Sequence, residues 1–128
     1  MLTTTITFEG NLTSDPELRF TTAARPVVEF TVLVGQRTRT DAGEWVDAEP
    51  TRHVVKAIGV LAENITESLT KGDRVIVVGH VVTDTWRHKD TGDKRTAPRV
   101  LADTIGPSLR WATTRITKTH PYRDDTEE

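Results

Sequence analysis

The sequence predicts a small all-β domain with one helix, and three observations lead to this fold class. Five segments alternate apolar and polar side chains or are rich in β-branched residues, as strands with one buried face are. Two segments between them place a glycine beside acidic residues, which is typical of hairpin turns. One further segment repeats apolar residues every four positions and therefore predicts a helix. A chain of 128 residues fits one domain with a modest core.

The predicted strands are defined by their alternation or their β-branched residues. In chain order they are Thr3–Leu12, Val27–Val34, Arg52–Ile58, Arg74–Val82 and Arg99–Ile105. After the first strand, Asp15 and Pro16 predict a turn, because aspartate can bond nearby backbone and proline fixes its own φ. The predicted hairpin tips contain Gly43 and Gly92, where positive φ is available at no steric cost.

The predicted helix lies between the third and fourth strands, over residues Val60–Thr70. Leu61, Ile65 and Leu69 would share its buried face, and Gly72 stands where a left-handed helix stop is expected. Three strands, one helix and two strands is the element order of an OB-fold, a five-stranded Greek-key barrel. We expect this domain to cover residues 1–112.

Residues 113–128 form a short polar tail with an acidic end, and we expect this tail to be mobile. The whole chain has a net charge of −2, of which the last eight residues contribute −3. The first 120 residues are therefore close to neutral, so any anion-binding site must be a local patch.

Composition excludes several classes of function. There is no cysteine, so disulfides, thiolate metal sites and thiol nucleophiles are excluded. The sequence shows neither an apolar run long enough to span a membrane nor a signal peptide, and we expect a cytoplasmic protein. The four histidines lack the spacing of a zinc site, and Asp15 and Glu17 at a proline turn favour a capping role over a metal site. With no nucleophile–base pattern or phosphate loop, we expect no enzyme activity and no cofactor.

The segment GNLTSDPELRF, residues 10–20, resembles the opening strand and first turn of the bacterial single-stranded DNA-binding proteins. GEW at 43–45, LAEN at 61–64, LTKGDRVIVVG at 69–79 and IGPSLR at 105–110 resemble actinobacterial members of this family. The resemblance spans about residues 3–112. The chain resembles a short paralogue of the family's main protein. The resemblance implies a homotetramer that coats single-stranded DNA without sequence preference in DNA replication, repair or recombination, associated with the nucleoid.

Binding a single strand requires cations that neutralise phosphates and flat side chains that stack on bases. Trp86, followed by Arg87 and Lys89, matches a tryptophan that the family uses for stacking; packing against the hairpin is the alternative. Trp45 at the first hairpin is either a second platform or a half-exposed strand aromatic. Further stacking candidates are Trp111, Tyr122 and the phenylalanines.

The third predicted strand has Arg52, Val54, Lys56 and Ile58 on one face. A face that mixes cations with apolar side chains cannot be core, so it is either a binding face or a solvated one. Where the best-known members of the family have aromatics, this chain has Arg37, Arg52 and Ile58. Arginine can still stack its planar guanidinium, but isoleucine can only pack. We expect binding that is weaker and more salt-dependent than in aromatic-rich relatives.

The second hairpin is basic and resembles the flexible loop that extends the family's binding groove; an ordinary solvated hairpin is the alternative. The predicted DNA-binding residues are therefore Arg37, Arg39, Trp45, Arg52, Lys56, Ile58, Trp86, Arg87, Lys89, Lys94, Arg95 and Arg99. The residues leave two alternative functions open, an OB-fold adaptor that binds replication proteins and an OB-fold nuclease. Family members recruit enzymes through an acidic tip with an apolar anchor. The acidic end here lacks that anchor, so we expect no such recruitment.

Overall fold

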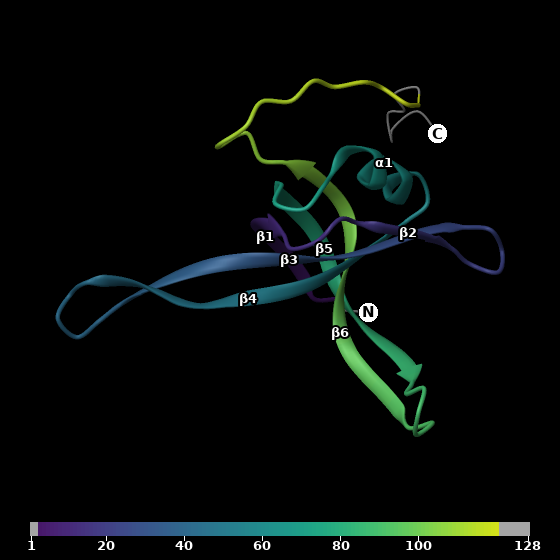
Figure 1. Ribbon diagram of the computed structural model, residues 1–128, viewed down its shortest axis with the longest axis horizontal. Helices are drawn as coiled ribbons and strands as arrows, with labels where there is room; N and C mark the ends of the chain where they lie inside the picture. The colour runs from purple at the N-terminus through teal and green to yellow at the C-terminus, as the bar shows by residue number, and fades with distance from the viewer. Residues whose placement is uncertain (1–2, 121–128) are drawn as a thin grey trace.

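The structure is a computed structural model that describes residues 3–120, within which there are six strands and one helix (Figure 1). The elements are β1 (Thr5–Leu12), β2 (Glu17–Phe20), β3 (Pro26–Arg39), β4 (Trp45–Ile58), α1 (Val60–Ser68), β5 (Arg74–Arg87) and β6 (Lys94–Pro107).

Five of the strands close into a barrel in the order β1-β5-β6-β4-β3, because β1 pairs with both β5 and β3. Neighbouring strands are antiparallel except β4 and β6, whose parallel pairing joins only Val55 to Val100 and Lys56 to Leu101. This closed barrel with one helix confirms the predicted OB-fold. The short β2 lies outside the barrel along the edge of β3. Strand β2 is not among the five predicted strands. It has only four residues, and it begins directly after the proline turn.

Valines fill the barrel, because β-branched side chains pack well on a pleated surface with one buried face. The largest fully buried side chains are Val28, Val32, Val55, Val75 and Val77. Burying a side chain of this size contributes roughly 1.5–3 kcal/mol. The alternation of these residues with exposed neighbours fixes the register of each strand and so determines which side chains face outward.

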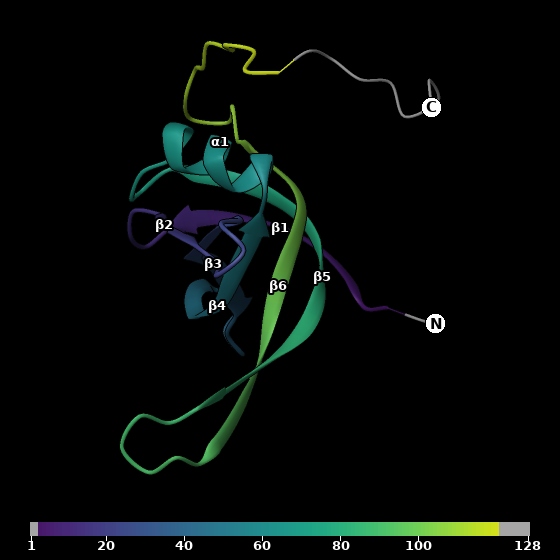
Figure 2. The same cartoon turned by 90° about the vertical axis from the view of Figure 1, so that its right-hand side faces the viewer.

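Helix α1 covers one end of the barrel with the predicted face, since Ile65 and Leu69 are buried with Ala62 (Figure 2). The predicted helix stop was wrong. The helix ends at Ser68, and Leu69 already has extended backbone angles. Gly72 does have positive φ, 91°, but it belongs to the following turn, where its N–H donates to Leu12 O.

Asp15 accepts from a backbone N–H that is distant in the chain, so this contact is not the local capping that the sequence predicts. Its Oδ1 accepts the Lys71 N–H at 2.8 Å, which joins the first turn to the turn after α1. Gly10 and Gly79 allow close approach of strands, because a Cβ at either position would collide with the backbone oxygen of Leu33 or Leu101.

Two pairs of strands continue beyond the barrel as two-stranded ribbons that point in different directions (Figure 1). We call residues 35–50 the β3–β4 arm and residues 83–99 the β5–β6 arm. Gly43 and Gly92 turn their tips with φ of 84° and 72°, as predicted. The predicted strands stopped short of both arms. An arm exposes side chains on both faces, so its sequence lacks the alternation that marks a half-buried strand.

Beyond β6, residues 108–120 have no regular secondary structure and lie beside α1, where the Thr119 hydroxyl donates to Asn64 Oδ1 at 3.1 Å (Figure 1). The acidic end of the chain, residues 121–128, lies outside the described residues. Between residues 3 and 120 no helix combines the length and apolar character that a membrane crossing requires.

Candidate nucleic-acid interface

The outer face of β4 has the composition that strand parity predicts. Val55 and Ala57 are fully buried in the barrel, whereas Arg52 and Ile58 are exposed. Lys56 lies on the same outer face as Arg52 but is only half-exposed. The structure therefore provides an outward surface with an arginine, a lysine and an apolar side chain in line.

Lys56 is engaged by a carboxylate that the sequence analysis did not single out. Its Nζ donates to both carboxylate oxygens of Asp84 on β5, at 3.2 and 3.0 Å. The two side chains are 26% and 31% exposed, so water screens the pair only partly. The charge of Lys56 is thus balanced within the protein, unlike that of Arg52, which has no carboxylate within 4.0 Å among the described residues.

Trp86 lies near the end of β5 with 43% of its surface exposed, and Arg99 of β6 covers part of its ring. The guanidinium carbon is 5.4 Å from the ring centroid, which is a cation–π arrangement. Arg99 also donates from Nη1 to Pro98 O at 3.1 Å, while its Nε is buried without a hydrogen-bond partner in the described part of the chain. Trp86 and Arg99, predicted separately, therefore form one unit.

The β3–β4 arm contains a second tryptophan–arginine unit. Arg39 lies 5.8 Å from the ring centroid of Trp45, which is 59% exposed. Arg39 and Arg37 also hold the arm together, with Nε of Arg39 donating to Gly43 O at 3.3 Å and Nη2 of Arg37 to Trp45 O at 3.3 Å. Arg37 Nε is 3.7 Å from a carboxylate oxygen of Asp47. The cations of this arm are partly committed to internal contacts.

The β5–β6 arm presents its cations more freely. Arg87 closes the tip by donating to Gly92 O at 3.1 Å. Within residues 3–120, no carboxylate lies within 4.0 Å of the basic group of Arg87, Lys89, Lys94 or Arg95. The arms also differ in net charge. The β3–β4 arm has two basic and four acidic residues, and the β5–β6 arm has five basic and three acidic residues. A polyanion is therefore attracted to the second arm and repelled by the first.

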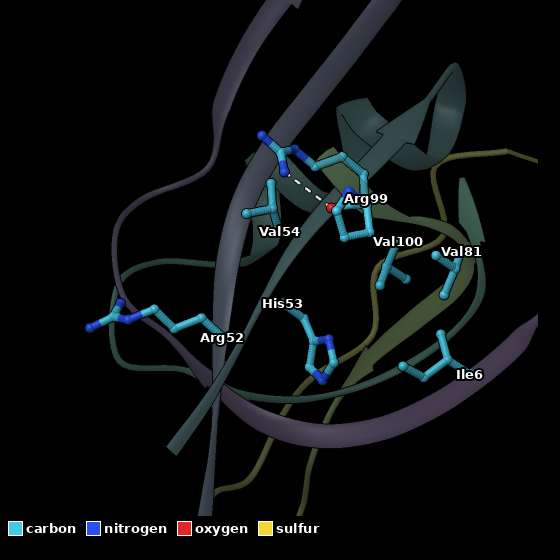
Figure 3. A pocket seen from close by; sticks show the side chains of 8 residues that line it. Ile6, Arg52, His53, Val54, Val81, Arg99 and Val100 are labelled. Atoms are coloured by element: carbon cyan, nitrogen blue, oxygen red, sulfur yellow. Dashed lines mark hydrogen bonds between the residues drawn. The ribbon is translucent and has the colours of Figure 1, made fainter. Parts of the chain in front are cut away.

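A cavity of about 460 Å³ opens where β4 and β6 diverge below their short parallel pairing (Figure 3). Its lining combines apolar side chains with two arginines and a histidine, namely Ile6, Arg52, His53, Val54, Val81, Pro98, Arg99 and Val100. His53 stacks on Phe8 with ring centroids 4.2 Å apart, and burial lowers the pKa of His53. Arg52 points away from the other lining residues (Figure 3).

The remaining aromatic candidates are dispersed. Trp111 is 79% exposed and follows β6, Phe20 is exposed on β2, and Phe30 is buried in the core. Tyr122 lies outside the described residues. The structure therefore concentrates aromatic and cationic groups on the two arms and on the outer face of β4, and leaves the other aromatics elsewhere.

Comparison with known proteins gives one consistent family. The family model described as the single-strand binding protein family matches residues 3–108. A single-stranded DNA-binding protein of Mycobacterium leprae is 47% identical over 116 residues, which is 90% of this chain and 68% of that protein. Single-stranded DNA-binding protein 2 of Streptomyces coelicolor is 41% identical, covering 91% of this chain and 58% of that protein. The crystal structure of a small single-stranded DNA-binding protein from the same organism superimposes with a TM-score of 0.68 and 31% identity, covering 85% of this chain and 97% of that one.

Proposed function

This chain belongs to the single-strand binding protein family, and we propose that it coats single-stranded DNA without sequence preference. The observation that carries the proposal is the Trp86–Arg99 unit beside the unpaired cations of the β5–β6 arm. An exposed aromatic ring stacks on any base, and neighbouring cations neutralise any phosphate. This combination gives affinity without reading the sequence.

We propose that three regions of the surface contact the DNA. Trp86 and the cations of the β5–β6 arm form the main site, where Arg87, Lys89, Lys94 and Arg95 attract phosphates. On the outer face of β4, Arg52 stacks or contacts phosphate and Ile58 packs against bases or sugars. Arg37, Arg39 and Trp45 form a weaker site on the β3–β4 arm, because the acidic residues there oppose a polyanion.

We propose further that the protein assembles as a homotetramer. Residues 5–10 of β1 pair with β5 on one side only, so the described strands leave their other edge unpaired. Exposed Ile76 and Val78 on the adjacent β5 add apolar surface beside this edge. An open edge with apolar neighbours supports pairing with a second copy. Light scattering of the purified protein measures the number of subunits, and a monomer at micromolar concentration would contradict assembly.

We also propose a setting and a domain division. The OB-fold domain is residues 1–112, followed by a tail. Members of this family act on DNA without catalysing a reaction, so we propose a cytoplasmic, non-enzymatic role on exposed strands in DNA replication, repair or recombination. Incubating oligonucleotide with protein and Mg²⁺ tests the non-enzymatic part, since a nuclease would shorten the oligonucleotide.

Titration with oligo(dT) tests the central proposal. Stacking on Trp86 should quench tryptophan fluorescence with a dissociation constant in the low micromolar range or tighter. Oligo(dA) of the same length should bind with similar affinity if recognition is independent of sequence. Unchanged fluorescence together with no retention of labelled oligonucleotide at low salt would contradict the proposal and favour an adaptor that binds replication proteins.

A further inference from the structure

Most of the outward cations on β4, β5 and β6 are free, but Lys56 is not. Among the described residues, Lys56 makes the one ion pair between a predicted DNA-binding cation and a carboxylate that also has hydrogen-bond geometry. Both oxygens of Asp84 accept from its Nζ, at 3.2 and 3.0 Å. Arg37, by comparison, is 3.7 Å from Asp47, and these two side chains are 65% and 93% exposed. Lys56 is therefore the cation whose contact with phosphate is most strongly opposed.

The position of Asp84 places this carboxylate within the proposed binding surface. Side chains alternate along a strand, so Asp84 and Trp86 lie on the same face of β5. Lys56 lies on the outer face of β4 with Arg52. Strand β6 runs between β4 and β5, so the pair spans β6 and joins the base of the β5–β6 arm to the barrel. The pair therefore lies beside two predicted contacts, with Lys56 between Arg52 and Ile58 on β4 and Asp84 two residues from Trp86 on β5.

A second carboxylate borders Lys56. Glu29 of β3 is its register partner and so lies directly across from it on the same face. The cation nearest Glu29 is Arg19, at 3.9 Å in an exposed pair. On the other side, Arg99 is turned toward Trp86 rather than toward Asp84. Asp84 is thus the carboxylate that holds Lys56, and Glu29 adds to the negative potential there.

We infer that Asp84 limits the affinity of this surface for single-stranded DNA by holding Lys56. Its carboxylate and a backbone phosphate compete for the same ammonium group of Lys56. Because the pair is partly buried, salt weakens it less than it weakens an exposed phosphate contact. DNA therefore gains little from Lys56, and the strand is held mainly by the β5–β6 arm. This inference rests on the proposed function.

The substitution Asp84→Asn tests the inference, because it keeps the shape of the side chain and removes its charge. Freed Lys56 should take one more phosphate, so oligo(dT) should bind roughly 3- to 10-fold more tightly near 0.1 M salt. The slope of log K against log salt should steepen by about 0.7, the value for one phosphate of a single strand. Asp103→Asn is the matched control, since it also removes a carboxylate from this sheet, but one that lies 3.4 Å from His80 of β5 and not beside a predicted DNA-binding cation. The control should leave both quantities unchanged.

The background Lys56→Gln separates competition from simple repulsion. If Asp84 acts through Lys56, the gain from Asp84→Asn should vanish in Lys56→Gln protein; a gain of the same size there would overturn the inference. Equal affinity of wild type and Asp84→Asn would overturn it as well, provided that circular dichroism shows both folded. Asp84→Ser serves the same test if the asparagine variant does not fold. Failure of the wild type itself to bind oligo(dT) would instead contradict the proposed function.

Discussion

The two arms are built alike and charged oppositely. Each is a two-stranded ribbon with a glycine of positive φ at its tip and an arginine over a tryptophan ring, at 5.8 Å for Trp45 and 5.4 Å for Trp86. The β3–β4 arm has a net charge of −2 and the β5–β6 arm a net charge of +2, from the residue counts given above. The same local geometry is therefore set in opposite electrostatic surroundings.

On the proposed function, this difference means that a stacking platform alone does not define a nucleic-acid site. Trp45 is more exposed than Trp86, yet the carboxylates around it repel the phosphate that must accompany each stacked base. We propose that stacking and phosphate neutralisation act together only on the β5–β6 arm. Exposure of the aromatic ring and local charge therefore rank the two arms in opposite orders, and the order given by local charge is the one that we propose.

Removing each tryptophan in turn should have the largest effect on this comparison. Trp86→Ala should weaken oligo(dT) binding roughly 5- to 100-fold, since one stacked base contributes about 1–3 kcal/mol. Trp45→Ala should weaken it by no more than about 3-fold, because few strands stack there against the charge of that arm. Fluorescence anisotropy of a labelled oligonucleotide measures both affinities. It does not depend on tryptophan fluorescence, part of which each variant loses.

Both variants are expected to keep the barrel intact, because neither ring belongs to the buried core. Circular dichroism and a thermal melt provide this control. An equal or larger loss for Trp45→Ala would reverse the order of the two arms, and unchanged affinity for Trp86→Ala would remove Trp86 from the site.

Neutralising cations on each arm should give the next largest effect. The double variant Lys94→Gln, Arg95→Gln should lower the slope of log K against log salt by about 1.4, that is 0.7 for each lost phosphate contact. Affinity near 0.1 M salt should fall roughly 30-fold, at about 1 kcal/mol for each of the two contacts. These residues have no carboxylate partner in the described chain, so their loss should not disturb internal pairs.

The matched variant on the other arm is Arg37→Gln, Arg39→Gln. These arginines donate to backbone oxygens and Arg37 faces Asp47, so we expect a slope change below about 0.7. Equal slope changes for the two double variants would show that both arms contact phosphate to the same extent. The proposed division between the arms would then be wrong.

The barrel could be predicted from the sequence because burial leaves a pattern in it. Val55 and Ala57 are buried and alternate with Arg52 and Lys56, so parity alone assigned the faces of β4. The arms could not be predicted as strands, because backbone pairing holds them and both of their faces are exposed. The turns and the charges of the arms were therefore predictable from the sequence, but their length was not.

The residue types of the site were predictable, but their partners were not. Lys56 and Asp84 are 28 positions apart, and they meet because of how β4, β6 and β5 are ordered in the sheet. The contact of Arg99 with Trp86 likewise depends on the register between β5 and β6. Pairings of this kind decide which cations are free. They are properties of topology, and no local motif encodes them.

The smallest expected effect concerns the barrel rather than either arm. Burial holds the pKa of His53 below its ordinary value of 6.5, so the unfolded chain binds more protons than the folded one near that pH. Stability should be full above pH 6.5, fall as the pH drops through 6.5 toward the folded pKa, and level off below it. The loss should be small, because the imidazole is only partly buried. Urea unfolding at about pH 7.5 and about pH 5.5 measures it.

The variant His53→Phe keeps an aromatic ring against Phe8 and removes the titrating group, so its stability should change less between the two pH values. Titration of Glu9 does not affect the comparison between about pH 7.5 and about pH 5.5. Its pKa is lowered by hydrogen bonds from Arg74 and Ser108, so its contribution is lost only as the pH falls below its ordinary value of 4.5. The same loss of stability in wild type and His53→Phe would show that His53 does not carry the pH dependence, and burial of this imidazole would then have no measurable part in the stability of the barrel.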